Sequence, residues 1–475
     1  MVQVHPRGLS RFAMEISART RWTRCPRSET LEGQQNPTQG AQMTSRSTST
    51  ADRGATGPRQ TAIPAAGRAA RGGGPVPQAP SGVGFWFVAA SFAVLMAFGT
   101  APTPLWPLYE ARDGFGATTV TVAYAVLVVG SAFGFVALGH LSDRFGRRRV
   151  VVPSLLVGIV AALVLAIQPS LPGLLAGRVL NGVAIGLMAS TATAYLHDLY
   201  HQRHPERPGS TLPGVVATMA NLGGLALGPL VAGLVAEWAP HPLAATQIGF
   251  AVAMAVCLVL SLSTPETVDA ERRAQGRPAR FALRPGSQGP FTASLALAFF
   301  SFALLGLLSS LGAIMLHEEL HISSHLIAGL APFLMFAASA VGQLLLGGMR
   351  PARMTATGAA VFAVGLGLVA LSLYHPALWL FLVAVVIAGA GAGVLFKGGV
   401  VMASASAEPT SRAGVLAVYF TAGYLGLGGP SILFSVVTHH VSVQSTMVGF
   451  AVLLTLGAAL SAAFGARHAA ARPVG

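Results

Sequence analysis

Charged side chains are scarce in this sequence. Asp, Glu, Lys and Arg account for 10% of its 475 residues, whereas about 25% is usual in soluble domains. Hydrophobic residues account for 53%, and the mean hydropathy is +0.63. So few charges cannot cover a surface that faces water, and the apolar residues come in blocks long enough for membrane-spanning helices of about 20 residues. The sequence therefore predicts an all-α integral membrane protein.

Cysteine is almost absent, and so are the usual marks of an enzyme. The two cysteines, Cys25 and Cys257, give no disulfide framework. The sequence contains no metal-ligand spacing, no nucleophile elbow and no Gly-rich phosphate loop. We therefore expect neither an enzyme nor a bound cofactor or metal.

Acidic residues are also few, 16 against 30 Lys and Arg, which leaves a net charge of +14. Such a balance often indicates a nucleic acid or anionic lipid partner. Here eleven of the arginines precede residue 72, and most of the others lie in short loops on one side of the proposed membrane. We expect the lipid bilayer as a partner, and no nucleic acid.

The first 83 residues differ in composition from the rest. Residues 1–83 contain no long apolar run and are rich in Arg, Ser, Gly and Pro. A segment of this kind cannot bury a core, so we expect a disordered tail. It lacks the central hydrophobic region of a secretory signal. Its Arg-rich, acid-poor character is only faintly similar to a transit peptide, and we expect translation to begin at Met43.

Long hydrophobic runs follow from Phe85 onwards. The twelve runs are 85–104, 118–140, 150–168, 172–196, 212–236, 243–263, 291–316, 324–347, 354–374, 377–402, 412–437 and 443–464. They predict two six-helix bundles, at 84–263 and 291–464. A Pro- and Arg-rich cytoplasmic linker at 264–290 would join the bundles, and a short cytoplasmic tail would follow at 465–475.

Arginine is distributed unevenly between alternate loops. With the N-terminus in the cytoplasm, fourteen arginines lie in inside loops and only Arg112 lies in an outside loop. Positive side chains favour the cytoplasmic side of a membrane. The sequence therefore predicts a multi-pass protein of the cell membrane with both termini in the cytoplasm.

Glycines recur in corresponding runs of the two halves. The matches are Gly182 and Gly186 with Gly389 and Gly393, and, at an offset of 200, Gly223 and Gly228 with Gly423 and Gly428. Two repeats around a site near the bilayer midplane are typical of alternating access.

Loop 139–149, between the second and third runs, carries one Asp and four Arg. Its sequence, GHLSDRFGRRR, follows the pattern G-x-L-a-D-R-x-G-R-[RK]-[RK] at every position. In this respect the chain resembles the secondary transporters of the major facilitator superfamily. The resemblance implies twelve helices in two pseudo-symmetric six-helix bundles, the MFS fold.

The resemblance also assigns roles within this loop. Asp143 would cap the start of the helix expected at 412–437, and Arg147 or Arg144 would bind Asp198. Together they would latch the two halves in the outward-open state.

Three further loop residues belong to the expected latch. Gly139 and Gly146 would allow close packing and a tight turn, and Arg148 would add positive charge. The alternative is an anchor whose arginines only fix the topology, which does not explain Asp143 or the glycines. The corresponding loop of the second half, Gly347–Arg353, lacks the Asp.

An arginine lies inside the run at 172–196. Arg178, Asn181 and Gly182 resemble the family motif R-x-x-q-G, whose Arg is linked to proton coupling. An Arg inside a membrane helix is costly and must face protein or water. The alternative is snorkelling, because Arg178 lies only about 9 Å from the outer end at 1.5 Å per residue.

The run at 212–236 resembles the antiporter signature G-x3-G-P-x2-G-G of drug/proton exchangers, through Gly224, Gly228, Pro229 and Gly233. Ala232 replaces one Gly of the closing pair. These small residues would press this helix against the helix expected at 324–347. The alternative is generic packing of small residues.

Other polar residues lie inside the expected helices. Lys397 is the single lysine of the chain, and a desolvated lysine can lose its proton near neutral pH, whereas arginine cannot. It is a candidate for the coupling proton or for binding an anionic substrate group, and snorkelling is the alternative. Possible cavity-lining residues are Tyr124, Asn221, Gln343, Tyr419 and Tyr424. We expect Trp106 and Tyr109 in an interfacial aromatic belt.

Three functions are compatible with these observations. The first is proton-coupled efflux of small hydrophobic compounds or drugs by a monomer that uses the proton gradient and no cofactor. The second is proton-linked uptake of a small metabolite or organic anion on the same fold, which Lys397 favours. The third, a receptor or scaffold that does not transport, is disfavoured by the latch, the repeat and the buried charges.

Overall fold

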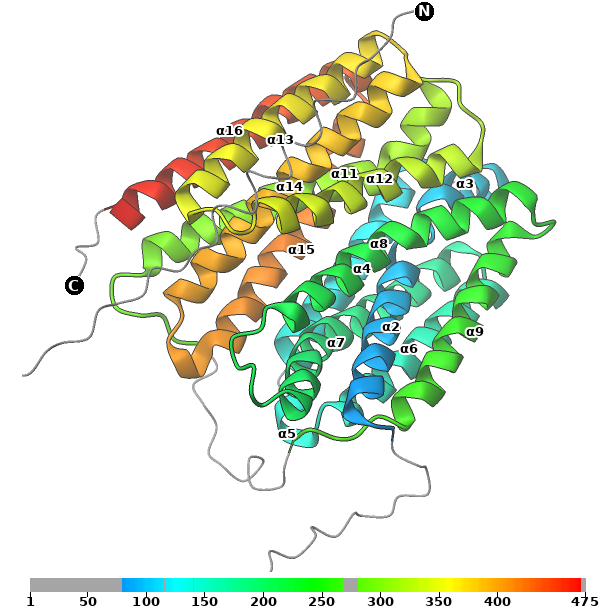
Figure 1. The fold of residues 1–475 in the computed structure, drawn as a ribbon. Coiled ribbons are helices and arrows are strands. Elements are labelled where there is room, and N and C mark those ends of the chain that lie inside the picture. Colours follow the sequence, from blue (N-terminus) through cyan, green and yellow to red (C-terminus); the bar gives the residue numbers. More distant parts are fainter. Residues whose placement is uncertain (1–78, 115, 140, 269–280, 471–475) are drawn as a thin grey trace, which may run out of the picture. The chain divides into compact units, whose positions relative to one another are not determined.

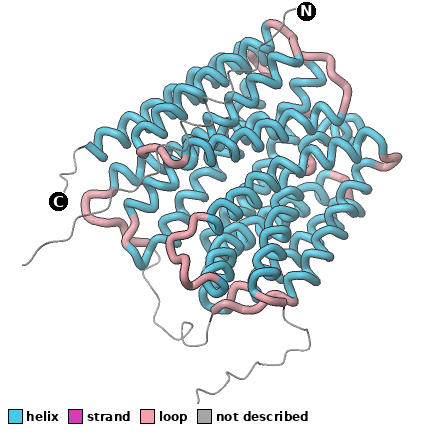
Figure 2. Tube along the Cα trace, viewed as in Figure 1, coloured by secondary structure: helices cyan, strands magenta, loops and turns pink. Residues whose placement is uncertain are grey.

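The computed structural model describes residues 79–114, 116–139, 141–268 and 281–470. Within these ranges, twelve helices are long and apolar enough to cross a membrane, as the sequence predicts. Figure 2 shows helices joined mostly by short loops.

The first bundle contains six of these helices. Its elements are α2 (Ser81–Thr100), η1 (Thr103–Leu105), α3 (Trp106–Asp113), α4 (Ala117–Phe133), the π-helical turn η2 (Gly134–Leu138), α5 (Leu141–Phe145), α6 (Arg148–Ile167), α7 (Leu171–Arg203), α8 (Leu212–Trp238) and α9 (Pro242–Leu262). Prolines in the first turn, for example Pro172 of α7 and Pro213 of α8, suit positions whose N–H has no partner within the helix.

The second bundle contains the other six. Its elements are α11 (Gln288–Glu318), α12 (His325–Leu346), α13 (Pro351–Tyr374), α14 (Leu378–Ser406), η3 (Pro409–Ser411), α15 (Arg412–Val437) and α16 (Val443–Ala470). In Figure 1 the first bundle is drawn from blue to green, and the second from yellow-green to red. The bundles meet where α8 packs against α12 and α4 packs against α15.

Glycine allows the same close approach inside both bundles. A Cβ at Gly130 of α4 or Gly134 of η2 would collide with the backbone of α7 around Gly182 and Gly186, and the reverse also holds. In the second bundle, Gly389 and Gly393 of α14 lie against the carbonyls of Met335 and Ser339 of α12. These contacts confirm the structural repeat predicted from the α7 and α14 glycines.

The second predicted match, at an offset of 200, does not hold in three dimensions. Gly228 lies against Ala97 of α2 in its own bundle, whereas Gly428 lies against Ala125 and Val128 of α4 in the other bundle. The α8 and α15 helices are corresponding elements, but these glycines occupy different faces of them.

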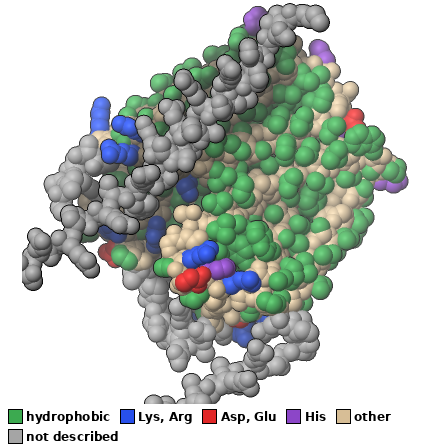
Figure 3. Space-filling view, viewed as in Figure 1, with side chains coloured by type: hydrophobic (Ala, Val, Ile, Leu, Met, Phe, Trp, Pro, Cys, Tyr) green, Lys and Arg blue, Asp and Glu red, His purple; other side chains and the backbone are tan. Residues whose placement is uncertain are grey.

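Large apolar side chains cover the outside of the helices. Val129, Val259, Leu345 and Leu460 are exposed, and Figure 3 shows green hydrophobic side chains over much of the visible face. Such a surface suits lipid rather than water. Below, the "basic end" is the end of the bundles that carries α5 and residues 263–268, and the "opposite end" is the one that carries η1 and α3.

Candidate functional site

Arg178 lies in the interior of the first bundle. Its side chain is 0% exposed, and its Nη1 donates a hydrogen bond of 3.0 Å to the carbonyl of Gly99. Its guanidinium carbon lies 5.2 Å from the ring centre of Trp106 and 5.6 Å from that of Tyr124, within the range of cation–π attraction. The snorkelling alternative is therefore wrong, because a snorkelling side chain would reach the surface.

A break in the first spanning segment creates this environment. Pro102 follows α2 and has no N–H to donate to the carbonyl of Phe98, four residues earlier. That carbonyl accepts a bond of 3.5 Å from Asn181 Nδ2 instead. The chain then turns through η1 into α3, which begins at Trp106. The break therefore provides a carbonyl for Asn181 and an aromatic face for Arg178.

Trp106 and Tyr109 are not an interfacial belt. Both are 0% exposed, and their rings lie 5.9 Å apart beside Arg178. The expectation of a belt is wrong because both side chains are enclosed within the protein. The sequence carries one usable signal for this, the three prolines Pro102, Pro104 and Pro107 around these aromatics.

Several buried polar atoms near Arg178 have no hydrogen-bond partner of good geometry among the residues that the structure describes. They are Arg178 Nε and Nη2, Asn181 Oδ1, Trp106 Nε1, the Tyr109 hydroxyl and the side-chain amide of Gln247. Gln247 lies on α9 beside Tyr109, and nothing in the sequence singled it out. Unused polar capacity at this depth is typical of a binding site rather than of a packed core.

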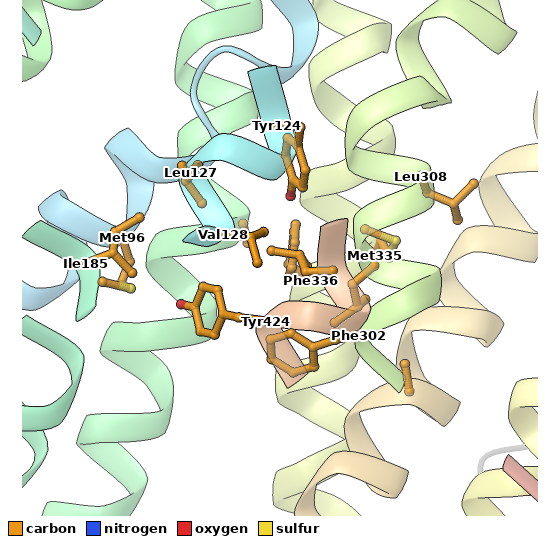
Figure 4. Close-up of a cluster of buried hydrophobic side chains, with 14 of the residues drawn as sticks. Met96, Tyr124, Leu127, Val128, Ile185, Phe302, Leu308, Met335, Phe336 and Tyr424 are labelled. Atoms are coloured by element: carbon orange, nitrogen blue, oxygen red, sulfur yellow. The ribbon is translucent and has the colours of Figure 1, made fainter. Parts of the chain in front are cut away.

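A second group of side chains fills the interface between the bundles (Figure 4). The first bundle contributes Met96, Tyr124, Leu127, Val128 and Ile185, and the second contributes Phe302, Leu308, Met335, Phe336 and Tyr424. All ten are buried. We call these ten residues the central cluster. It is apolar and aromatic apart from two tyrosine hydroxyls.

The predicted cavity-lining residues separate into groups. Tyr124 and Tyr424 belong to the central cluster. The hydroxyl of Tyr419 donates 2.7 Å to the carbonyl of Phe396, which is the alternative role of bonding between helices. Gln343 is buried on α12 with its Nε2 unpartnered, and Asn221 is half-buried on α8.

Lys397 does not lie near Arg178. It is half-buried on α14, and its Cε approaches Gly347, directly after the end of α12 at the basic end. Arg178 lies about 10 Å from the start of α7, at the opposite end, and Lys397 lies about 14 Å from the end of α14, at the basic end, at 1.5 Å per residue. The two cations therefore occupy different depths.

At the basic end, Arg147 rather than Arg144 reaches Asp198. Its Nε lies 3.2 Å from Asp198 Oδ2, and its Nη1 donates 2.8 Å to Ser142 Oγ. Arg144 is exposed over the ring of Phe145. Arg147 makes these contacts and Arg144 does not, because Arg147 follows the turn and lies next to α7.

Glu266 completes this group, and sequence reasoning missed its role. Its Oε1 accepts hydrogen bonds from the backbone N–H of Arg147 (2.7 Å), Thr267 (3.0 Å) and Val268 (3.3 Å). The Thr267 hydroxyl donates 3.2 Å to Asp198 Oδ2. The available signal was a Glu directly after the sixth hydrophobic run.

The glycines and Arg148 of the loop have local roles. Gly146 adopts φ +113°, and a Cβ there would collide with the Glu266 carboxylate. A Cβ on Gly139 would collide with the carbonyl of Phe135. Arg148 donates to the carbonyls of Leu262 (3.2 Å) and Thr264 (3.1 Å) at the end of α9.

These contacts of the loop all lie within the first bundle. The side chain of Asp143 lies outside the part of the chain that the structure describes. Its predicted contact with the start of α15 therefore stays a prediction, and so does the latch that depends on it.

The residues that resemble the antiporter signature lie on α8, on two of its faces. Gly224 and Gly228 lie against the carbonyls of Ala93 and Ala97 of α2, in the same bundle. Pro229 and Gly233 lie against α12 of the other bundle at Gly329. The prediction that all four press against the helix at 324–347 is therefore wrong for the first two. Residues four apart share a helix face, whereas Gly228 and Pro229 differ by about 100°.

Two polar contacts that join the bundles lie at the opposite end. Glu237 of α8 accepts bonds from Leu326 N (3.0 Å) and the Ser324 hydroxyl (3.2 Å), so it caps the start of α12. The Thr118 hydroxyl of α4 lies 2.8 Å from Nε2 of His439, just after α15. Twelve apolar helices in two similar bundles, with a buried polar group beside an apolar interface, define the class of polytopic membrane transport proteins.

Comparison with known proteins gives the family. The sequence profile of the Major Facilitator Superfamily matches residues 87–353, more than half of the chain. The chain belongs to this superfamily, whose members are transporters rather than enzymes.

Individual relatives match shorter segments. The bacillibactin exporter of Bacillus subtilis is 30% identical over 155 residues, which cover 31% of this chain and 38% of the exporter. The glucose transporter GlcP of Staphylococcus epidermidis is 35% identical over 82 residues, which cover 17% of this chain and 18% of that transporter. The matches therefore span less than half of the length of these relatives.

Solved structures match nearly the whole fold. The nucleoside transporter NupG superposes with a TM-score of 0.63 at 14% identity, covering 80% of this chain and 99% of that one. The human organic anion transporter MFSD10 superposes with a TM-score of 0.57 at 20% identity, covering 81% and 100%. At such identities the likeness shows the fold alone.

Proposed function

We propose that this protein is a secondary active transporter that exports small hydrophobic compounds in exchange for protons. The observation that carries the proposal is the central cluster. It places apolar and aromatic side chains of both bundles against one another, so that a hydrophobic molecule could replace those contacts when the bundles part. Alternating access between two repeats then moves the molecule across the membrane.

The distribution of charge supports a single orientation. Both termini lie in the cytoplasm of a cell membrane protein, because the arginine-rich loops belong on that side. The basic end is then cytoplasmic. On this orientation, the contacts of Glu237 and Thr118 between the bundles close the outer side.

Two groups of residues would carry the mechanism. Arg178 with Asn181, and separately Lys397, are the candidates for coupling to the proton gradient. Asp143, in the loop that the contact between Arg147 and Asp198 of α7 fixes within the first bundle, would hold the two bundles together in the outward-open state. No cofactor is needed, since the proton gradient supplies the energy, and the monomer contains the complete path.

Uptake of an organic anion or small metabolite is the second candidate function. The specific observation in its favour is Arg178, a buried cation with two unpartnered nitrogens. The relatives named above carry different substrates, so they do not decide between the two directions.

Transport in proteoliposomes tests the direction. The purified chain is reconstituted under an imposed pH gradient with a panel of hydrophobic dyes, sugars and organic acids. We expect dyes to move against the proton flux, and the protonophore-treated vesicles serve as the control. Accumulation of the compounds together with the protons would instead establish uptake and refute export.

A further inference from the structure

Arg178 is a buried cation with hydrogen-bonding capacity left unused. Its side chain is 0% exposed, and only Nη1 donates to the chain, to Gly99, while Nε and Nη2 have no partner among the described residues. A buried charge is costly unless it is paired and hydrogen-bonded. Burial of the guanidinium therefore has a desolvation cost that no ion pair with the described residues offsets.

No carboxylate of the described chain pairs with this guanidinium. The ion pairs in that part of the chain involve Asp113, Glu206 and Asp198, and Arg178 belongs to none of them. Its neighbours are the rings of Trp106 and Tyr124. Aromatic faces attract a cation but do not neutralise it, so the positive charge is available to an anion from outside.

We propose that Arg178 binds the anionic group of the transported molecule, and that this molecule is an amphipathic organic anion. The inference rests on the proposed transport function and names its substrate class. A carboxylate or sulfonate accepts two N–H groups from one guanidinium in a planar fork. Trp106 Nε1 on the adjacent α3 is a further buried donor without a partner among the described residues, and the Tyr109 hydroxyl lies nearby beside Gln247.

The apolar body of the molecule has a place next to this group. Tyr124 contacts both sites, because its ring lies 5.6 Å from the Arg178 guanidinium carbon and it belongs to the central cluster. Figure 4 shows Tyr124 extending from α4 toward the side chains of the second bundle. An anionic group at Arg178 would therefore place an attached hydrophobic body among Phe336, Tyr424 and their neighbours.

Charge pairing also explains why an anion is preferred to a cation here. An organic anion that enters an apolar interface alone loses its hydration, and the fixed guanidinium offsets part of that cost. A cation would meet repulsion from Arg178, and no carboxylate of the described residues pairs with this side chain to compensate. A neutral compound would gain only the apolar contacts.

Binding of a matched ligand series tests the inference. The full-length chain in detergent micelles is titrated by calorimetry with 2-naphthoate, 2-naphthamide and 2-naphthylmethylammonium, which share one apolar body. We expect 2-naphthoate to bind about tenfold or more tightly than the amide, as a charge-assisted bond provides, and the ammonium to bind most weakly. Equal affinities of the carboxylate and the amide would overturn the proposal, because water alone at Arg178 predicts that result.

Substitutions of Arg178 test whether this side chain causes the preference for the carboxylate over the amide. Arg178→Met should reduce the carboxylate-to-amide ratio to about one while the affinity for the amide changes less than about twofold, since only the charged bonds are lost. Arg178→Lys keeps the charge and should retain part of the ratio. Arg353→Gln removes an exposed arginine at the basic end and should keep the wild-type ratio. A preference that survives in Arg178→Met would also overturn the proposal, and the wild-type series decides the matter if that variant does not fold.

Transport of the same compounds separates the two proposals. Gradient-driven movement of a neutral dye without preferential binding of 2-naphthoate would refute the anion site and leave the transport function intact. Arg178-dependent binding of 2-naphthoate without movement of any compound would leave the site intact and refute the transport function.

Discussion

Arg178 and Lys397 are the two cations that the structure places well inside spanning helices, and their surroundings differ. Arg178 is enclosed by aromatic rings and a backbone carbonyl, whereas Lys397 is half-buried beside Gly347 at the basic end. Enclosure suits ligand binding, and partial exposure allows exchange of a proton with water. Each cation therefore needs a test of its own.

Replacement of Lys397 tests whether this side chain carries the coupling proton or only snorkels to the membrane surface. If Lys397 carries the coupling proton, both Lys397→Met and Lys397→Arg should abolish gradient-driven transport in proteoliposomes, because Arg does not release its proton. Exchange of substrate without a gradient should persist in both variants. Wild-type gradient-driven transport in Lys397→Arg would exclude Lys397 from coupling, since Arg snorkels as well as Lys.

Gly146 gives the loop between η2 and α6 a backbone conformation that other residues rarely adopt. We expect Gly146→Ala to lower the thermal stability of the detergent-solubilised protein, because φ +113° is strained for Ala and its Cβ would displace the Glu266 carboxylate. Such backbone strain costs of order 1–3 kcal/mol. Gly209→Ala is the matched control, since a Cβ there meets nothing within 4 Å. Equal melting temperatures for the two variants would contradict the contact with Glu266.

Among the helices, α8 has two faces that pack against different partners. The face with Gly224 and Gly228 packs on α2 within the bundle, and the face with Pro229 and Gly233 packs on α12 across the interface. The first face holds the bundle together, and the second is the one that would part and re-form in the proposed alternating access.

Alanine substitutions on the two faces of α8 should have different effects. Gly228→Ala should lower the free energy of unfolding by about 1–3 kcal/mol, because its Cβ would overpack the contact with α2. Gly233→Ala should leave the bundle folded but reduce the transport rate, because the Cβ meets His325 and Gly329 of α12. Gly223→Ala, which meets nothing within 4 Å, is the control for both measurements. The assignment fails if Gly228→Ala slows transport without any loss of stability.

The segment around α2 and α4 contains the irregular backbone of the first bundle. The Pro-rich break after α2 orients Trp106 toward Arg178, and the π-turn η2 holds Phe135, which stacks on Phe420 of α15 at 5.7 Å. A π-turn shifts the following side chains around the helix axis. Phe135 thereby contacts the second bundle.

For the whole molecule, the proposal predicts opposite shifts from changes at the two ends. Glu237→Gln weakens the cap on α12 and should shift the population toward the outward-open state. Asp143→Asn weakens the expected latch and should shift it toward the inward-open state. Electron–electron distances between spin labels at Ala239 and His375, at the opposite end, should lengthen in the first variant and shorten in the second. Identical distance distributions in Asp143→Asn and the wild type would refute the latch.

The central cluster shows why part of the site could not be predicted from the sequence. Tyr124 and Tyr424 stood out because polar residues are rare inside apolar runs, and both lie in the cluster. Met96, Phe302 and Met335 could not be distinguished from the many other apolar residues. Their role depends on which helix face turns toward the other bundle, and runs that are apolar all round carry little periodic signal.

The sequence by itself determined the membrane location, the twelve spans, the two-bundle repeat and the family resemblance, because hydrophobic length and the spacing of Gly and Arg are local properties of the chain. Only the tertiary structure decided that Trp106 and Tyr109 enclose Arg178, that Glu266 holds the turn at Arg147, and that α8 divides its glycines between two partners. These facts depend on the faces that helices present to one another. Close packing fixes those faces, and no local pattern in the chain encodes them.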